Sequence, residues 1–426
     1  MILALVACTA ARDPSPPALR ELLAATDLDP DPAVLEVDLL AHADGARWTW
    51  VDPWGGGSFL DLGGAERLVV HLTNALPVST TLHIHGLRLL ASQDGTVHSQ
   101  HLVFPGESHD YFVDVVDEGL AWYHPHFDSA EQVERGLYAP IRAQGGDPLP
   151  VSADRVIVLD DTRLLPDGSP DLAETPEDRY AGRVGDVLLV NGDPAGIGTV
   201  VAGRRERWRF LNAANARVFR LDLHATEIAH EGGTLAVPRA VEEVVLSPGD
   251  RVEVVVDVLG GERFDVSALP YDRGYGAEPA EPEVLFSVLG IGGPPPGPLP
   301  IRAARPSLSA PDAALRELVF SRVSPDRYAV DGESWPFNTP LTAEAGAVER
   351  WALRNDTEAE LPFHLHGTFM QAETGWEDVV TVPPHDHREV LVPLDAPGAW
   401  MFHSHVLEHA ELGMMGVIDV RAGTPE

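Results

Sequence analysis

Four His-x-His pairs constrain this chain more than any other feature of its sequence. They are His83/His85, His124/His126, His364/His366 and His403/His405. In a β-strand, residues i and i+2 point to the same face, roughly 6.6–6.8 Å apart, so each pair presents two imidazoles side by side. One such pair arises by chance on a surface or in a core. Four pairs, divided between two distant parts of the chain, indicate metal ligation, and they exceed the four ligands of one tetrahedral zinc.

The rest of the chain predicts an all-β fold. Hydrophobic runs are short and alternate with polar residues, as in 67–72 and 251–257. Pro-Gly turns at 105–106 and 248–249 separate such runs, which is typical of β-sandwiches. A single helix is expected over Ala18 to Ala25, before the first sandwich.

The 426 residues are more than one hydrophobic core normally serves. Glycine- and proline-rich breaks at 145–148 and 292–298 predict where the chain divides. We expect an N-terminal segment and tether over 1–29, a first domain over 30–146, a second over 147–292, a linker over 293–307 and a third domain over 308–426. A strand followed by an asparagine recurs at Asn74, Asn212 and Asn355, which suggests three copies of one sandwich.

The residues around the histidines carry a family resemblance. The motifs are Leu-His-Ile-His-Gly at 82–86, Trp-Tyr-His-Pro-His at 122–126 with Gly-Leu-Tyr at 136–138, Pro-Phe-His-Leu-His-Gly at 362–367, and His-Ser-His-Val-Leu-Glu-His at 403–409 with Gly-Met-Met at 413–415. The middle of the chain adds Leu-Val-Asn-Gly at 189–192 and Leu-Asn-Ala-Ala-Asn at 211–215. In this order, the motifs resemble those of the multicopper oxidases.

The resemblance implies three consecutive cupredoxin-like Greek-key β-sandwich domains, with copper ligands in the first and the third only. It also implies a cluster of three copper ions. His83 and His364 would hold a type 2 copper. The type 3 pair would be held by His85, His124, His126, His366, His403 and His405. In the family, such a cluster reduces dioxygen to water with electrons from a small reducing substrate or a redox protein.

Asp94 has two interpretations. It matches an acidic residue that relays protons near the cluster in the family, which makes it the candidate catalytic residue. In the turn Asp94-Gly95 it is equally a structural turn aspartate.

The sequence departs from the family at the type 1 (blue) copper site. The family's cysteine between the last two histidines is Ser404 here, and its histidine before the proline of the third motif is Leu361. Blue copper needs a thiolate, and a serine hydroxyl is a far weaker acid. The two remaining positions, His409 and Met414, offer one imidazole and one weak thioether. We therefore expect no type 1 copper, and we interpret both residues as core packing.

Three further histidines are expected at the surface. His71 lies on the outward-facing set of an alternating strand. His385 and His387 form a fifth His-x-His, but in a turn just before a strand, so we interpret them as exposed loop residues. An extra metal site or a substrate contact is the alternative for this pair.

Charge and cysteine content bound the partners. The formal net charge of −36 disfavours nucleic acid and anionic lipid surfaces. The only cysteine is Cys8. The run Leu5-Val6-Ala7-Cys8 resembles a bacterial lipobox, with a chance tetrapeptide as the alternative, so we expect a lipid anchor and a place on the periplasmic side of the cell envelope.

Two functions follow from these observations. The first is a copper-dependent oxidoreductase that works with the trinuclear cluster and lacks type 1 copper. The alternative is a non-catalytic copper-binding protein or cell-envelope scaffold of the same fold.

Overall fold

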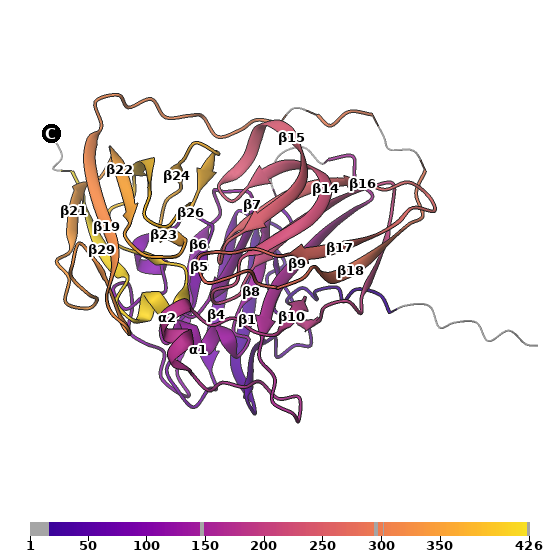
Figure 1. Cartoon of the computed structure of the whole chain (residues 1–426), viewed down its shortest axis with the longest axis horizontal. Helices are drawn as coiled ribbons and strands as arrows, with labels where there is room; N and C mark the ends of the chain where they lie inside the picture. Colours follow the sequence, from indigo (N-terminus) through magenta and orange to yellow (C-terminus); the bar gives the residue numbers. More distant parts are fainter. Residues whose placement is uncertain (1–16, 145–148, 294–296, 301, 424–426) are drawn as a thin grey trace, which may run out of the picture.

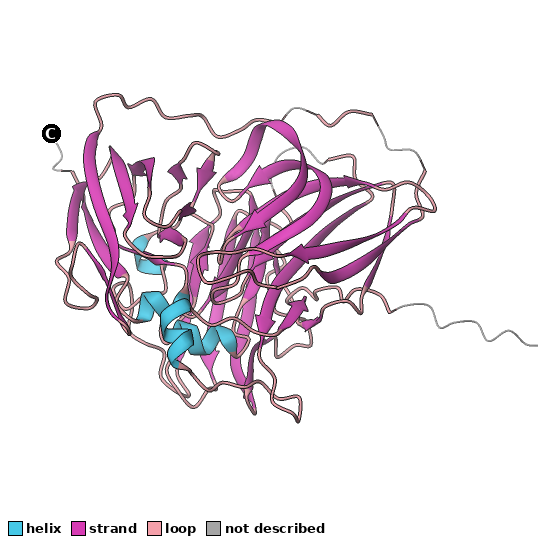
Figure 2. Cartoon of the chain, in the orientation of Figure 1, coloured by secondary structure: helices cyan, strands magenta, loops and turns pink. Residues whose placement is uncertain are grey.

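The computed structural model describes residues 17–144, 149–293, 297–300 and 302–423, and almost all regular structure in them is β-strand (Figures 1 and 2). Cys8 and the breaks at 145–148 and 294–296 lie outside the described residues, so the lipobox and the domain boundaries stay predictions. No helix in the described part has the length and apolar character that a membrane crossing requires.

The first unit forms two four-stranded sheets, in the orders β2-β1-β4-β6 and β3-β8-β7-β5. Its strands are β1 (Val34–Asp44), β2 (Arg47–Val51), β3 (Leu60–Asp61), β4 (Arg67–Asn74), β5 (His83–His85), β6 (Ser108–Asp114), β7 (Gly119–His124) and β8 (Ala139–Ala143), with a 3-10 turn at Ala91–Gln93 and helix α1 (Ser129–Glu134).

The third unit forms a six-stranded sheet, β20-β19-β22-β27-β24-β25, and a five-stranded sheet, β21-β29-β28-β23-β26. Its strands are β19 (Ala314–Ser324), β20 (Arg327–Val330), β21 (Leu341–Glu344), β22 (Ala347–Asn355), β23 (Leu361–Leu365), β24 (Met370–Gln371), β25 (Trp376–Glu377), β26 (Val379–Val382), β27 (His387–Leu394), β28 (Gly398–Ser404) and β29 (Met415–Arg421), with helix α3 (Leu407–Glu411).

The middle unit joins its strands into one ten-stranded sheet instead of two separate ones. Its strands are β9 (Ala153–Thr162), β10 (Val187–Val190), β11 (Asp193–Pro194), β12 (Thr199–Ala202), β13 (Arg205–Asn212), β14 (Phe219–His230), β15 (Gly233–Leu246), β16 (Arg251–Asp257), β17 (Arg263–Leu269) and β18 (Glu283–Gly290), with helix α2 (Pro176–Ala181). Strand β14 connects the two halves, because its first part pairs with β17 and its last part with β16. Its pairing with β15 shifts register between Asp222 and Ala225, and such bulges let a strand pass from one sheet to another.

The three units repeat one pairing scheme, which confirms an all-β fold of three consecutive sandwich-like units. In each unit the first long strand pairs in parallel with a later strand, as β1 with β4, β9 with β13 and β19 with β22. That later strand then pairs antiparallel with β6, β16 or β27.

The recurring asparagine marks the same corner of each unit. Asn74, Asn212 and Asn355 end β4, β13 and β22, and all three are fully buried. Each side-chain amide donates to at least two backbone carbonyls, and each Oδ1 accepts from the backbone N–H two residues later. The weak echo in the sequence is therefore a structural repeat, since these buried amides satisfy the polar backbone of three equivalent turns.

The helix expected over Ala18 to Ala25 is wrong. This segment is extended and forms isolated bridges with Thr199 and Phe59. Its backbone forms hydrogen bonds with the middle unit, from Leu19 N–H to the Thr199 carbonyl, and with the first unit, from Ala25 N–H to the Phe59 carbonyl. Tertiary pairing outweighs the local helix propensity of the alanines and leucines.

The first and third units share one hydrophobic core, which fixes how they face each other. The largest buried cluster includes Trp50 and Leu82 from the first unit and Phe363 and Trp400 from the third. The short helices α1, α2 and α3 gather at one end of the molecule (Figure 2).

Candidate metal centre

The eight paired histidines meet at the contact between the first and third units. In the first unit, β5 pairs with β7, so that His83 lies opposite His124. In the third unit, β23 pairs with β28, so that His364 lies opposite His403. Each sheet therefore places its two His-x-His pairs next to each other, and the two sheets bring them to one place.

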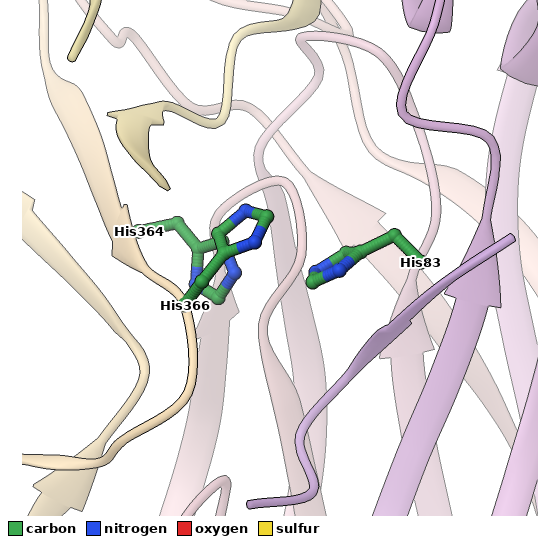
Figure 3. A group of neighbouring side chains, drawn as sticks. All are labelled: His83, His364 and His366. Carbon is green, nitrogen blue, oxygen red and sulfur yellow. The ribbon is translucent and has the colours of Figure 1, made fainter. Parts of the chain in front are cut away.

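Rings of one unit face rings of the other. His83 stacks on His366 with ring centroids 3.9 Å apart, and His85 stacks on His364 at 3.8 Å. Figure 3 shows His83 reaching from the first unit toward His364 and His366 of the third. The other two rings of each unit are close as well, with His126 5.0 Å from His403 and His124 5.7 Å from His405.

The Nδ1 atoms of most rings have hydrogen-bond acceptors. A backbone carbonyl or a carboxylate oxygen can only accept, so these contacts place the ring proton on Nδ1 and leave the Nε2 lone pair free. The contacts run from His83 to the Asp94 carbonyl (2.7 Å), from His124 to the Pro125 carbonyl (2.9 Å), from His364 to the Asp378 carbonyl (2.7 Å), from His403 to the Ser404 carbonyl (2.8 Å) and from His366 to Asp94 Oδ2 (2.9 Å). His85 differs, because its Nδ1 lies 3.3 Å from the Arg251 guanidinium, which can only donate.

Most of the Nε2 atoms have no partner outside the histidine cluster among the described residues. Those of His83, His85, His124 and His364 are buried and have no hydrogen-bond partner in the part of the chain that the structure describes, and His405 has none at either nitrogen. The Nε2 of His403 lies 3.2 Å from that of His126 and 3.1 Å from that of His366. Converging lone pairs repel one another, so this arrangement suits a cation held between them.

Burial favours the neutral form of seven of the eight rings. Seven of the eight histidines are at most 2 % exposed. Burial lowers the pKa of His403 to about 4 and that of His405 to about 3. It also lowers the pKa values of His85, His124, His126, His364 and His366 well below the usual range. Neutral imidazole is the ligand form for copper, so the residues fit a copper centre.

Asp94 lies between the two units at this centre. It is 1 % exposed, its Oδ2 is 2.9 Å from His366 Nδ1 and its Oδ1 is 3.4 Å from His83 Nδ1. Its carbonyl and carboxylate therefore contact rings of both units.

The four positions that correspond to type 1 ligands in the family are all buried. Ser404 is fully buried, and its Oγ accepts a hydrogen bond from Val406 N–H at the start of α3. Leu361 and Met414 are 2 % and 1 % exposed within the shared core. His409 stacks on Tyr328 at 4.2 Å, and its Nε2 lies 3.1 Å from the Tyr180 carbonyl.

The three histidines expected at the surface are exposed or partly exposed. His385 and His387 are exposed. His71 is partly exposed and contacts Asp110 and Glu36 through its two ring nitrogens. These two carboxylates raise its pKa, although burial acts in the opposite direction.

Four residues at the centre were missed by sequence reasoning. Asp378 contacts His85 and His364, and it is bound in turn by Arg251 and Glu231 of the middle unit. Gly249 has a positive φ of +88°, and a Cβ there would lie 3.0 Å from the His405 ring. The only signal for any of them was the Pro248-Gly249 turn, which indicates a turn but not its neighbours.

Comparisons with known proteins agree with this geometry. The sequence pattern of the multicopper oxidase family matches residues 57–146 and 310–424. The multicopper oxidase mco of Staphylococcus aureus is 27 % identical over 392 residues, which cover 85 % of this chain and 82 % of that protein. The cell division protein FtsP of Escherichia coli is 29 % identical over 336 residues, which cover 69 % of each.

The solved structures include a multi-copper oxidase from Pseudomonas thermotolerans. It superposes with a TM-score of 0.80 at 26 % identity, over 91 % of this chain and 99 % of that one. The sequence pattern matches the first and third units, the relatives and the solved structure cover most of the chain, and the chain belongs to the multicopper oxidase family.

Proposed function

We propose that the chain is a copper-dependent oxidoreductase that uses a trinuclear copper cluster and has no type 1 copper. His83 and His364 would hold the type 2 copper. The type 3 pair would be held by His85, His124, His126, His366, His403 and His405. The observation that carries the proposal is the convergence of eight imidazoles, most of whose Nε2 atoms have no partner outside the cluster among the described residues.

The absence of type 1 copper rests on the donors at positions 404 and 361. A hydroxyl at Ser404 does not replace a thiolate, and Leu361 has no donor atom. His409 already lies within reach of the Tyr180 carbonyl and against Tyr328. The cysteine-to-histidine route that carries electrons in the family is therefore missing here.

Electrons would come from a small reductant or a redox partner. Bound copper would supply the one-electron redox chemistry by which dioxygen takes up four electrons and four protons to give two waters. The protein's own part is to hold the imidazoles and to deliver protons. Asp94 is the candidate for delivery, because its buried carboxylate contacts His366 directly.

Copper analysis and electron paramagnetic resonance test the proposal. Copper-loaded protein should contain about three ions per chain and give a type 2 signal with no blue absorption. Oxygen uptake should follow the addition of phenols, cuprous ion or another small reductant. Fewer than three ions, or no oxygen uptake with any donor, would contradict the oxidoreductase.

A non-catalytic role is the second candidate, and the exchange of donors at Ser404 and Leu361 favours it. One relative, FtsP, is named as a cell division protein and not as an oxidase, which supports a non-catalytic role as the alternative. A scaffold has no use for eight converging imidazoles, which is why we rank it second. A protein that cannot take up copper would support the scaffold, whereas three ions without oxygen uptake would support copper binding alone.

We also propose a bacterial envelope location on the periplasmic side, with Cys8 as a lipid attachment site. This rests on the lipobox-like run before Cys8. Incorporation of labelled fatty acid in cells should be lost in the Cys8→Ser variant. Equal labelling of both proteins, or none in either, would contradict the anchor.

A further inference from the structure

A cavity lined by acidic side chains lies where the three short helices meet. Helices α1, α2 and α3 belong to the first, middle and third units and gather at one end of the molecule (Figure 2). Residues of all three helices line a cavity of about 250 Å³, and none of the eight histidines lines it. Its six carboxylates are those of Glu131, Glu134, Glu174, Asp178, Glu408 and Glu411. All three units therefore contribute negative charge to one small space.

The cavity has an exposed rim and a buried floor. The exposed residues are Glu131, Glu174 and Glu411, and the buried side chains are those of Glu134, Asp178 and Glu408. A small molecule can therefore enter from solvent and reach buried negative charge.

Four of the six carboxylates have an arginine partner. These ion pairs join Glu131 to Arg135, Glu134 to Arg183, Glu174 to Arg179 and Asp178 to Arg163. Glu408 and Glu411 form no ion pair with any residue that the structure describes. Each accepts a neutral hydrogen bond of 2.8 Å instead, Glu408 from the Asn215 amide and Glu411 from the Ala130 N–H. Two carboxylates of the cavity are thus left without a compensating charge.

Glu408 has an oxygen that is free to bind a ligand. The residue is 5 % exposed, and its Oε2 has no hydrogen-bond partner among the described residues. Burial raises the pKa of Glu408, although the Asn215 amide and the nearby backbone N–H of Arg183 act in the opposite direction. Burial also raises the pKa of Glu134 to about 8, and the charges of Asp161 and Glu408 add to this, whereas Arg183 opposes it. A cation in the cavity would compensate the cost of these buried charges.

The arrangement favours an organic cation over a directly bound metal ion. A metal ion needs several oxygens around one point. Among the described residues, no three acidic groups of this cavity bring their ligand atoms within 4.8 Å of one another. An ammonium group has three N–H donors and can bind two separate carboxylates, such as those of Glu408 and Glu411. The volume is slightly below the roughly 300–1,000 Å³ of drug-sized sites, so it suits a small molecule.

A short stretch of chain connects the cavity to the histidine cluster. Glu408 is three residues after His405, and α3 begins at Leu407. Leu407 N–H donates to the carbonyl of Asn215, whose amide also binds Glu408. A molecule held at Glu408 is therefore joined to a proposed copper ligand by a short covalent path fixed by hydrogen bonds. Such a path matters because the proposed function lacks the thiolate route for electrons.

On the basis of the proposed function, we infer that this cavity binds the reductant, and that the reductant is a small phenol that carries an ammonium group. The ammonium group binds Glu408 and Glu411, and the ring lies against Ala130 and Leu172, the apolar residues of the lining. A catechol of this kind loses two electrons and two protons and becomes an o-quinone. Two catechols thus supply the four electrons and four protons with which one dioxygen forms two waters.

The first measurement needs no copper. Phenethylamine has the ring and the ammonium group but no hydroxyl, so it reports binding alone. Calorimetry of metal-free protein should show one phenethylamine site, and Glu408→Gln and Glu411→Gln should each weaken it by about 10-fold or more, since each removes a charged acceptor. 3-Phenylpropanoate, which carries a carboxylate instead, should not bind.

The control variants remove the same charge elsewhere. Glu349→Gln changes a buried glutamate of β22 and Glu389→Gln an exposed one of β27, and neither lines the cavity. Both should bind phenethylamine as the unchanged protein does. No binding by the unchanged protein, an equal loss in the controls, or displacement of phenethylamine by an equal concentration of Ca²⁺ would overturn the inference. If Glu408→Gln does not fold, Glu411→Gln decides, because Glu411 is exposed.

The second measurement uses copper-loaded protein and two catechols of opposite charge. Dopamine carries an ammonium group and 3-(3,4-dihydroxyphenyl)propanoate a carboxylate. Oxygen uptake should have a KM about 10-fold lower for dopamine or better, and Glu411→Gln should lose most of this preference. The net charge of −36 attracts any cation to the surface, but Glu389→Gln has the same net charge as Glu411→Gln and should keep the preference.

The two measurements separate the inference from the proposed function. Phenethylamine binding that depends on Glu411, in a protein that takes up no oxygen with any donor, would contradict the oxidoreductase and leave the ammonium site intact. Oxygen uptake that is indifferent to the charge of the catechol and to Glu411 would overturn the inference and leave the oxidoreductase intact.

Discussion

Asp94 makes two kinds of contact at this centre, one through its backbone carbonyl and one through its carboxylate. Its carbonyl accepts from His83 and its carboxylate from His366. Asp94→Asn keeps the carbonyl and the shape of the side chain but removes the charge. We expect copper-loaded Asp94→Asn to keep its copper and to lose oxygen uptake by about 10²-fold or more, the range typical of a lost acid–base group. Electrode measurements of oxygen uptake per copper ion check this.

The control for this prediction is Asp117→Asn. Asp117 is also buried, but it binds Arg88 and Arg305 away from the histidines. The Asp117→Asn variant should have a lower free energy of unfolding and an unchanged oxygen uptake per copper ion. Full uptake in Asp94→Asn would assign Asp94 to structure alone.

His409 gives a pH prediction at the residue scale. Burial, together with Arg273 nearby, lowers its pKa to about 3. The unfolded chain binds a proton at this ring below pH ~6.5, whereas the folded protein does so only near pH 3. The free energy of unfolding therefore falls as the pH drops through this window, by up to about 1.4 kcal/mol per unit from this ring.

Replacing His409 measures how much this ring contributes to the pH dependence of the unfolding free energy. In His409→Gln that contribution disappears, so the difference in unfolding free energy between the two proteins should change steadily from pH 6.5 to 4. Urea unfolding of metal-free protein at several pH values measures it. Parallel pH profiles would mean that His409 is protonated in the folded state or exposed.

At the scale of strands, the sequence predicted the features that depend only on residues within one strand or turn. The histidine pairs and the three asparagines could be recognised because each depends on neighbours in its own strand or turn. Asp378, Arg251 and Glu231 could not, because their roles arise only when the middle and third units meet. The helix expected over Ala18 to Ala25 failed for the same reason, since its hydrogen-bond partners lie at Phe59 and Thr199.

Strands β23 and β28 allow a test of the proposal that the chain has no type 1 copper. Phe363 on β23 pairs with Ser404 on β28, and Leu361 lies two residues before Phe363, so Leu361 and Ser404 share one face. We expect the Ser404→Cys and Leu361→His double variant to bind a further copper ion and to show intense blue absorption. The new buried imidazole should cost about 1–3 kcal/mol of stability without copper.

Ser404→Cys alone is the control, because it supplies the thiolate but only one imidazole, His409. It should stay without the intense band. A folded, copper-loaded double variant without the band would mean that the pocket around His409 and Met414 has diverged beyond these two positions.

At the scale of the whole molecule, the proposed copper centre would join two units that are far apart in sequence. The first unit contributes four imidazoles and the third contributes four, across a shared core. A ligand that binds only the folded arrangement stabilises it, by about 2.7 kcal/mol at a hundredfold excess over Kd. Copper should therefore raise the unfolding temperature of the entire chain.

Single substitutions in either outer unit should reduce this gain. We expect His83→Ala and His364→Ala each to lose most of the copper-dependent rise in unfolding temperature, because the ions are shared across the contact. His387→Ala removes a histidine from the exposed fifth pair and should keep the full rise. Thermal unfolding with and without copper measures all three. If His83→Ala and His364→Ala kept the rise as His387→Ala does, copper would be binding elsewhere, and the meeting of the two units would have another purpose.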